Sequence, residues 1–383
     1  MKYMDNNDIL NYFDIQSDIF FQNTSLIGNL GSLYLLSNID STKTEELLEK
    51  FYVEVQNASF VPSNIYGLSG IGLLLTYLDK VNPSVFNSHK TEFVADFADD
   101  IYDNALQMSK ELNYDTFEGL VSVLNFFIAS EQKQKTYQTL FLLQTISLQL
   151  YQNDKLNDFG LAHGICGIIA GLCKGFLYLK DSLKIKEKED IETTIALLTE
   201  HVLAHKLENN HYCFPMNTEQ EYSRLAWCYG DLSVSIALTW SLLVFPENEK
   251  IKSVLSDTLD NAISLKDNQR NYLVNNTDVD NITFDLGLCH GLAGNCLIFK
   301  RINEVFPKKE LQTEIERLEN EITKVLEKDK FDTKLPIPNQ ENEIVWQSDF
   351  SLLEGLSGVL LVHLDNKIQK GWDSLFLTDF PNV

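Results

Sequence analysis

Short apolar segments recur along the chain, and each follows a pair of small residues spaced three apart. Residues 28–31 (GNLG) precede the run SLYLL, and residues 67–70 (GLSG) precede IGLLLTYL. The same arrangement begins again at Gly119, Gly164, Gly230, Gly291 and Gly355. The seven ordered copies predict a repeated structural unit rather than a set of unrelated packing glycines.

The spacing and polarity of these units predict helical hairpins. Successive first glycines are 39, 52, 45, 66, 61 and 64 residues apart, and about 40 residues accommodate two helices and two turns. The runs after the glycines contain few charges, which is typical of buried helices. Segments between them, such as 253–265 and 311–326, place apolar residues at helical spacing among polar ones, which is typical of helices that cover a core.

Two such layers can extend as an open solenoid or close into a barrel. Seven units without obvious polar caps favour closure. We therefore predict an all-α, double-layered (α/α)7 toroid that forms a single domain over residues 1–383, with no sizeable inserted domain. In a closed ring every inner helix runs the same way, so the residues just before the glycines should gather at one mouth.

Metal-binding residue types occupy this mouth position in two of the units. Cys228 lies two residues before Gly230, Cys289 lies two before Gly291, and His290 follows Cys289. Two thiolates and an imidazole suit tetrahedral Zn²⁺, and three protein ligands leave a fourth position open for water or substrate. Each residue alone is compatible with a core thiol or a hydrogen-bonded histidine, but their shared register favours a site for one zinc ion.

Two further residues share the register. His163 and Tyr229, like His290, lie one residue before their glycine, so we expect them at the same mouth. Three other cysteines fall inside the apolar runs, where core packing explains them: Cys166, Cys173 and Cys296. Cys213 lies outside both patterns.

Composition narrows the function class. The net charge of −24 and the pI near 4.6 disfavour nucleic acid and anionic membranes as partners, while permitting a basic one. The chain has no apolar run of about 18 residues, so we expect no membrane span. We expect no export signal at the N-terminus either, and reduced cysteines in a cytoplasmic protein.

Three segments around these residues resemble the lanthionine synthetase C-like family: 223–230 (SRLAWCYG), 288–294 (LCHGLAG) and 161–167 (LAHGICG). The resemblance implies the same helical toroid and a zinc-dependent lanthionine synthetase. Such a cyclase acts on a dehydrated lanthipeptide precursor, adding cysteine thiolates to dehydroalanine or dehydrobutyrine to form the thioether rings of a lantibiotic. A dehydratase and an export transporter are further candidate partners, and peripheral membrane association through such a complex stays open.

The same resemblance implies roles for individual residues. It matches the family's zinc ligands to Cys228, Cys289 and His290, and its catalytic and accessory residues to His163, Asp115, Arg224 and Tyr229. Since an imidazole titrates near neutral pH, His163 is the candidate acid that protonates the enolate after sulfur addition. Arg224 is the candidate to balance the developing oxyanion, and Asp115 to orient His163 or Arg224.

Two alternatives stay open. A related protein that binds glutathione and adds thiols to dehydroamino acids would keep the fold and the metal. A non-catalytic zinc-stabilised scaffold of a biosynthetic complex would keep the metal without the reaction. A fourth protein ligand, such as Cys213, would favour the scaffold, whereas an open metal position would favour an enzyme.

Overall fold

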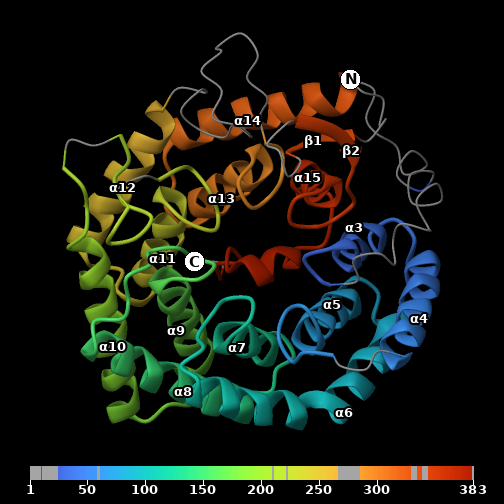
Figure 1. The fold of residues 1–383 in the computed structure, drawn as a ribbon, viewed down its shortest axis with the longest axis horizontal. Coiled ribbons are helices and arrows are strands. Elements are labelled where there is room, and N and C mark those ends of the chain that lie inside the picture. The colour runs from blue at the N-terminus through green and yellow to red at the C-terminus, as the bar shows by residue number, and fades with distance from the viewer. Residues whose placement is uncertain are drawn as a thin grey trace.

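The computed structural model describes residues 10, 25–57, 61–208, 211–220, 223–265, 285–328, 334–338 and 344–381, with side chains except at 54–57, 327–328, 334–338 and 344–348. Helices form two concentric rings around a central axis (Figure 1). The inner ring consists of α3 (Leu33–Leu36), α5 (Leu68–Val81), α7 (Leu120–Ala129), α9 (Ile165–Leu179), α11 (Asp231–Val244), α13 (Leu292–Val305) and α15 (Leu356–His363). The outer ring consists of α4 (Ser41–Asn57), α6 (Pro83–Lys110), α8 (Lys133–Gln152), α10 (Ile185–Leu203), α12 (Glu249–Ser264) and α14 (Lys309–Lys328). The predicted all-α toroid is confirmed.

Hydrophobic patterning explains which ring each helix joins. Residues 120–127 of α7 and 231–242 of α11 are buried on every side, because neighbouring inner helices and the outer ring surround them. In α12 the buried residues follow one stripe at helical spacing: Ile251, Leu255, Thr258, Leu259 and Ala262. Within the described residues, no helix is long and apolar enough to cross a membrane.

The ring closes between the two ends of the chain. A 3₁₀-helix, η1 (Asn29–Ser32), leads into α3, and α15 packs against both. The backbone N–H of Leu352 donates to the oxygen of Gly28 at 3.0 Å, and that of Leu353 to the oxygen of Ile27 at 2.9 Å. These bonds join the seventh mouth loop to the first and complete the circle of inner helices (Figure 1).

The second small residue of each motif lets the inner helix approach its own mouth loop. A Cβ at Gly294 would lie 1.9 Å from the backbone oxygen of Leu288, well inside contact distance. In the fifth unit a serine takes this place, and the Ser233 hydroxyl donates a 2.6 Å hydrogen bond to the oxygen of Trp227. The helix therefore stays close to its loop in either case, through glycine's missing side chain or through a hydrogen bond.

A common turn shapes four of the mouth loops. Each begins with an Asn or Asp six residues before the motif glycine: Asn113, Asp158, Asp285 and Asp349. The Oδ1 atom accepts from the N–H two residues later, at 2.6 to 3.2 Å. The backbone oxygen of the same residue accepts from the first N–H of the inner helix, at 2.8 to 3.1 Å. This Asx turn, with its repeated spacing to glycine, was visible in the sequence but not predicted.

Backbone hydrogen bonds also link successive mouth loops from the second to the seventh. The pairs are Ile65 N to Phe117 O, Thr116 N to Ala162 O, Leu161 N to Cys228 O, Trp227 N to Cys289 O and Leu288 N to Leu353 O, at 2.7 to 3.0 Å. Together with the closing bonds, they connect the mouth loops in one series from the second loop through the seventh to the first. These bonds position residues that are far apart in the chain against one another.

The central axis is filled by the C-terminal segment, which the sequence analysis did not predict. The 3₁₀-helix η4 (Trp372–Phe376) lies inside the inner ring (Figure 1), and its two aromatic ends are buried. The Trp227 indole donates to the oxygen of Phe376 at 2.8 Å, and its ring stacks on Phe117 with centroids 5.0 Å apart. The C-terminal segment therefore packs against the mouth loop that contains Cys228.

The connections from an outer helix to the next inner helix are longer in the second half of the chain. The connections from α10 to α11, from α12 to α13 and from α14 to α15 are each longer than the corresponding connections in the first half of the chain. The last of them contains an antiparallel pair, β1 (Lys334–Pro338) and β2 (Ile344–Ser348), in which Lys334 pairs with Ser348 and Pro338 with Ile344. This hairpin is an addition to the predicted helical ring.

Candidate metal centre and active site

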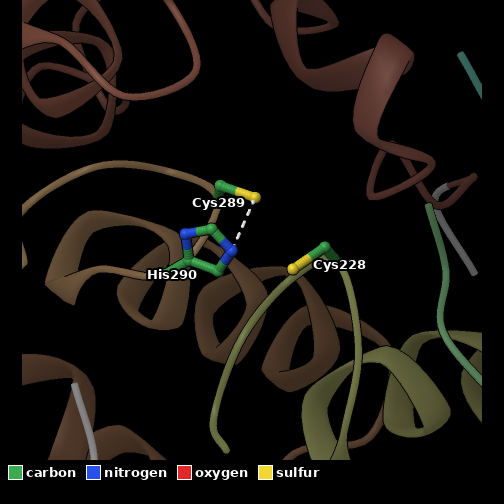
Figure 2. A group of neighbouring side chains, drawn as sticks. All are labelled: Cys228, Cys289 and His290. Carbon is green, nitrogen blue, oxygen red and sulfur yellow. Dashed lines mark hydrogen bonds between the residues drawn. The ribbon is translucent and has the colours of Figure 1, made fainter. Parts of the chain in front are cut away.

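Cys228, Cys289 and His290 converge at the mouth. One ligand atom from each lies within 4.8 Å of the other two, and the Cys289 Sγ is 3.4 Å from the His290 Nε2. Figure 2 shows both sulfurs and this nitrogen pointing toward one another from two different loops. Two soft sulfurs and an imidazole at such spacing fit the ligand set of a tetrahedral zinc ion. Among the described residues, this cluster contains no fourth His, Cys, Asp or Glu donor.

An irregular turn allows the adjacent residues Cys289 and His290 to face one point. Neighbouring side chains in a regular helix diverge by about 100°, but α13 begins only at Leu292. The oxygen of Cys289 accepts the Trp227 N–H at 2.8 Å, which fixes this loop against the one that contains Cys228. The two loops therefore meet through backbone atoms, independently of any metal.

The protons of the two thiols are coupled. A hydrogen bond from the Cys289 thiol lowers the pKa of Cys228 to about 5, against the opposing effect of burial and with help from His290 and the charge of Arg224. The same hydrogen bond, together with burial, raises the pKa of Cys289 well above its usual range. One of the two sulfurs is therefore ready to bind a cation as a thiolate at neutral pH.

The other face of His290 meets two carboxylates. Its Nδ1 is 3.7 Å from the Glu354 Oε1 and 4.0 Å from the Asp285 Oδ2. Desolvation in the mouth and repulsion from Asp285 raise the pKa of Glu354 to about 7. Sequence reasoning missed both residues. The available signal was the register, because Glu354 lies one residue before Gly355, as His290 lies before its own glycine.

His163 pairs with Asp115 across two neighbouring loops. The Nδ1 of His163 is 2.5 Å from the Asp115 Oδ2, while Asp115 Oδ1 accepts the backbone N–H groups of Phe117 at 2.7 Å and Glu118 at 2.9 Å. The hydrogen bond to Asp115 raises the pKa of His163, although partial burial opposes it. Since the imidazole is 65% solvent accessible, it can reach a bound molecule. Of the two roles expected for Asp115, the geometry favours orienting His163.

Arg224 and Tyr229 complete the mouth. The Nη2 of Arg224 donates to the backbone oxygen of His290 at 3.3 Å, and the ring of Tyr229 lies 6.4 Å from that of His290. The charge of Arg224 also contributes to the low pKa of Cys228. All seven residues singled out in the sequence thus lie on the linked mouth loops.

The remaining cysteines lie elsewhere. Cys166, Cys173 and Cys296 are buried in inner helices, as expected for core residues, and burial raises the pKa of each thiol. Cys213 is half-buried, and its backbone N–H donates to the Asp231 Oδ2 at 3.1 Å. It does not belong to the cluster of potential metal ligands among the described residues.

The fold and the site define a class: a double-layered helical toroid with a sulfur–imidazole centre and a His–Asp pair at one mouth. The family described as "Lanthionine synthetase C-like protein" matches residues 20–377, and the chain belongs to this family. Fourteen chains of solved structures match. One of them, named "Nisin cyclase", has a TM-score of 0.74 at 16% sequence identity, with 97% of this chain and 96% of that chain covered. No curated protein matches the sequence.

Proposed function

We propose that the protein is a zinc-dependent peptide cyclase of lanthipeptide biosynthesis. It would form lanthionine and methyllanthionine rings by adding cysteine thiolates of a precursor peptide to its dehydroalanine or dehydrobutyrine residues. The observation that supports this most directly is the convergence of Cys228, Cys289 and His290 within 4.8 Å beside an accessible His163. Family membership and the likeness to a protein named nisin cyclase support the same class of reaction.

Cys228, Cys289 and His290 would hold one Zn²⁺ ion. The ion supplies a Lewis acid that lowers the pKa of a substrate thiol, which is otherwise near 8.5 and mostly protonated at neutral pH. The donor set fits this task, because three protein ligands leave a position for substrate. The lack of a fourth donor in the described cluster favours an enzyme over a zinc-stabilised scaffold.

The protein's own side chains would then handle the protons and the charge. Addition forms a bond between the peptide sulfur and the β-carbon, and the electron pair of the double bond moves onto the α-carbon and its carbonyl oxygen. His163, whose protonated form is stabilised by Asp115, would donate a proton to the α-carbon. The thiol proton released at the start restores the imidazolium, so the net reaction adds S–H across the double bond. Arg224 would stabilise the negative oxygen, and Tyr229 would line the same mouth.

The test is cyclisation of a dehydrated lanthipeptide precursor by the purified zinc-loaded protein. Ring closure leaves the mass unchanged and removes free thiols, so thiol alkylation followed by mass spectrometry measures it. We expect thiols to disappear with the wild type but not with His163→Asn, which should retain zinc. A parallel incubation of glutathione with a dehydroalanine peptide tests the glutathione alternative. Adduct formation there without cyclisation would favour that alternative, and no reaction in either assay would contradict the proposed chemistry.

The proposed biosynthetic role also predicts partners. A dehydratase must supply the dehydroamino acids, and an exporter must remove the product, so both are candidate members of a complex with this protein. Co-purification of a tagged dehydratase with the cyclase would support the complex.

A further inference from the structure

The two ring nitrogens of His290 face different groups, a thiol on one side and carboxylates on the other. Nε2 lies 3.4 Å from the Cys289 sulfur, in the cluster of metal donors, and Nδ1 lies 3.7 Å from Glu354 and 4.0 Å from Asp285. A neutral imidazole has one N–H and one bare nitrogen, and only the bare nitrogen can bind a metal. Whatever accepts the proton on Nδ1 therefore decides whether Nε2 is available as a ligand.

We propose that Glu354 is the positioning residue for the metal-binding histidine, with Asp285 assisting. Its carboxylate, 3.7 Å from Nδ1 in this structure, would accept the Nδ1 proton of His290 after a small side-chain movement, which would fix the ring orientation and keep Nε2 free for zinc. Carboxylate–histidine–metal arrangements of this kind strengthen the ligand and are worth about 10- to 100-fold in metal affinity. The inference rests on the proposed zinc site and assigns a role to a residue from a different loop.

The backbone places Glu354 against the ligand loop. The oxygen of Leu353 accepts the N–H of Leu288 at 2.7 Å and that of Cys289 at 3.3 Å, so Glu354 follows directly on the link between the two loops. The backbone at Glu354 is therefore held next to the loop that contains Cys289 and His290. A surface glutamate held only by side-chain attraction would have no such constraint.

Gly287 provides the space that Glu354 needs. A Cβ at position 287 would lie 3.0 Å from the Cα of Glu354 and 3.0 Å from its Oε2. Both atoms would have to move away from the loop that contains His290. The φ angle of Gly287 is not in the positive region, so the close approach, rather than backbone conformation, explains the glycine.

The other contacts of the two carboxylates decide which of them is the principal partner of His290. Asp285 uses Oδ1 to cap the Gly287 N–H at 2.9 Å, which holds its Oδ2 at the longer distance from His290. Glu354 has the shorter distance, and 44% of its side chain is accessible to solvent, so it can adjust as the ring takes a ligand. Glu354 is therefore the principal partner, and Asp285 keeps the loop in shape and adds negative charge.

The experiment measures zinc affinity by competition with a chromogenic chelator, together with zinc stoichiometry and the thermal stability of the metal-free protein. We expect Glu354→Ala to weaken zinc binding about 10- to 100-fold and Glu354→Gln to weaken it less, since the amide oxygen can still accept the Nδ1 proton. Gly287→Ala should weaken binding as well, because it displaces the carboxylate. The matched control is Glu118→Gln, a glutamate one residue before its own glycine in another mouth loop, which should leave the affinity unchanged.

The outcomes separate the two proposals. If the wild type binds no zinc, or if Cys228→Ala binds it undiminished, the proposed metal site is wrong. If the wild type binds one equivalent and Glu354→Ala binds it equally tightly, only the positioning role is overturned. Binding of two equivalents, one of them lost in Glu354→Ala, would overturn it as well, because the carboxylates would then be ligands of a second ion. Lower stability of metal-free Glu354→Ala with unchanged zinc affinity would leave Glu354 a structural residue and contradict the inference.

Discussion

Replacing Arg301 with Met should destabilise the protein from its central axis. Arg301 is 3% accessible and joins two carboxylates of the C-terminal segment, both 1% accessible. Its Nε donates to Asp373 at 2.6 Å, and its Nη1 and Nη2 donate to Asp365 at 2.9 and 2.6 Å. Methionine fills a similar volume without charge, so the main effect is the loss of a partner for two buried carboxylates.

The structure allows the size of this effect to be worked out. Burial alone would raise the pKa of Asp365, but hydrogen bonds and charge from Arg301, with help from Lys370, lower it from 3.8 to about 2. At about 1.4 kcal/mol for each tenfold change in proton affinity, this corresponds to about 2.5 kcal/mol. Lys370 and the Trp372 indole continue to bond Asp365 after the substitution, whereas Asp373 keeps the Thr378 hydroxyl. We therefore expect a loss of about 3 kcal/mol, at the lower end of the range for breaking a buried ion pair.

Urea unfolding of the metal-free protein, followed by circular dichroism at pH 7, measures the loss. Lys324→Met is the control, since Lys324 pairs with Glu321 within one outer helix, at 2.7 Å, where both side chains are exposed, and should contribute about 0.5 kcal/mol or less. The native pKa of Asp365 lies below its unfolded value. Its stabilisation is therefore complete above about pH 4 and is lost as the pH falls toward 2. The difference between wild type and Arg301→Met should shrink over that window. A loss no larger than that of the control would refute the reasoning.

Three further predictions concern the mouth. Asp115→Asn removes the carboxylate that raises the pKa of His163, so the alkaline limb of the cyclisation pH profile should move to lower pH; an unmoved limb would mean that His163 is not the acid. Gly294→Ala places a Cβ 1.9 Å from a backbone oxygen, and should cost about 3 kcal/mol in urea unfolding, against about 1 kcal/mol for Ser233→Ala; equal losses would contradict the packing argument. In the metal-free protein, the low pKa of Cys228 (about 5) should keep alkylation by iodoacetamide nearly as fast at pH 6 as at pH 8, and zinc should block it; a rate about a hundredfold lower at pH 6 would disprove a preformed thiolate.

Part of the candidate site could be predicted because its reactive residues occupy the same position in different repeat units. Cys228, Cys289 and His290 stand at fixed distances before their glycines, and equal position in a repeat means equal position around a ring. Glu354 stands in the same register but was missed. A glutamate before a glycine has no distinctive meaning until the structure places it beside a particular histidine nitrogen. The pairing of His163 with Asp115 was likewise open, because two loops had to be brought together before the partner could be chosen.

The amino-acid sequence by itself determined the helices, their assignment to an inner or an outer ring, and the end of the ring at which the chemistry lies. These properties depend on local patterns, namely the apolar spacing within each helix and the glycines that let a helix approach its own loop. Only the tertiary structure decided how the ring closes, which mouth residues touch, and that the C-terminal segment occupies the axis. That segment is held by Trp227, Lys174 and Arg301, which belong to three different inner helices or their loops. Contacts between residues so distant in the chain leave no periodic pattern, so they become visible only when the inner helices are assembled around one centre.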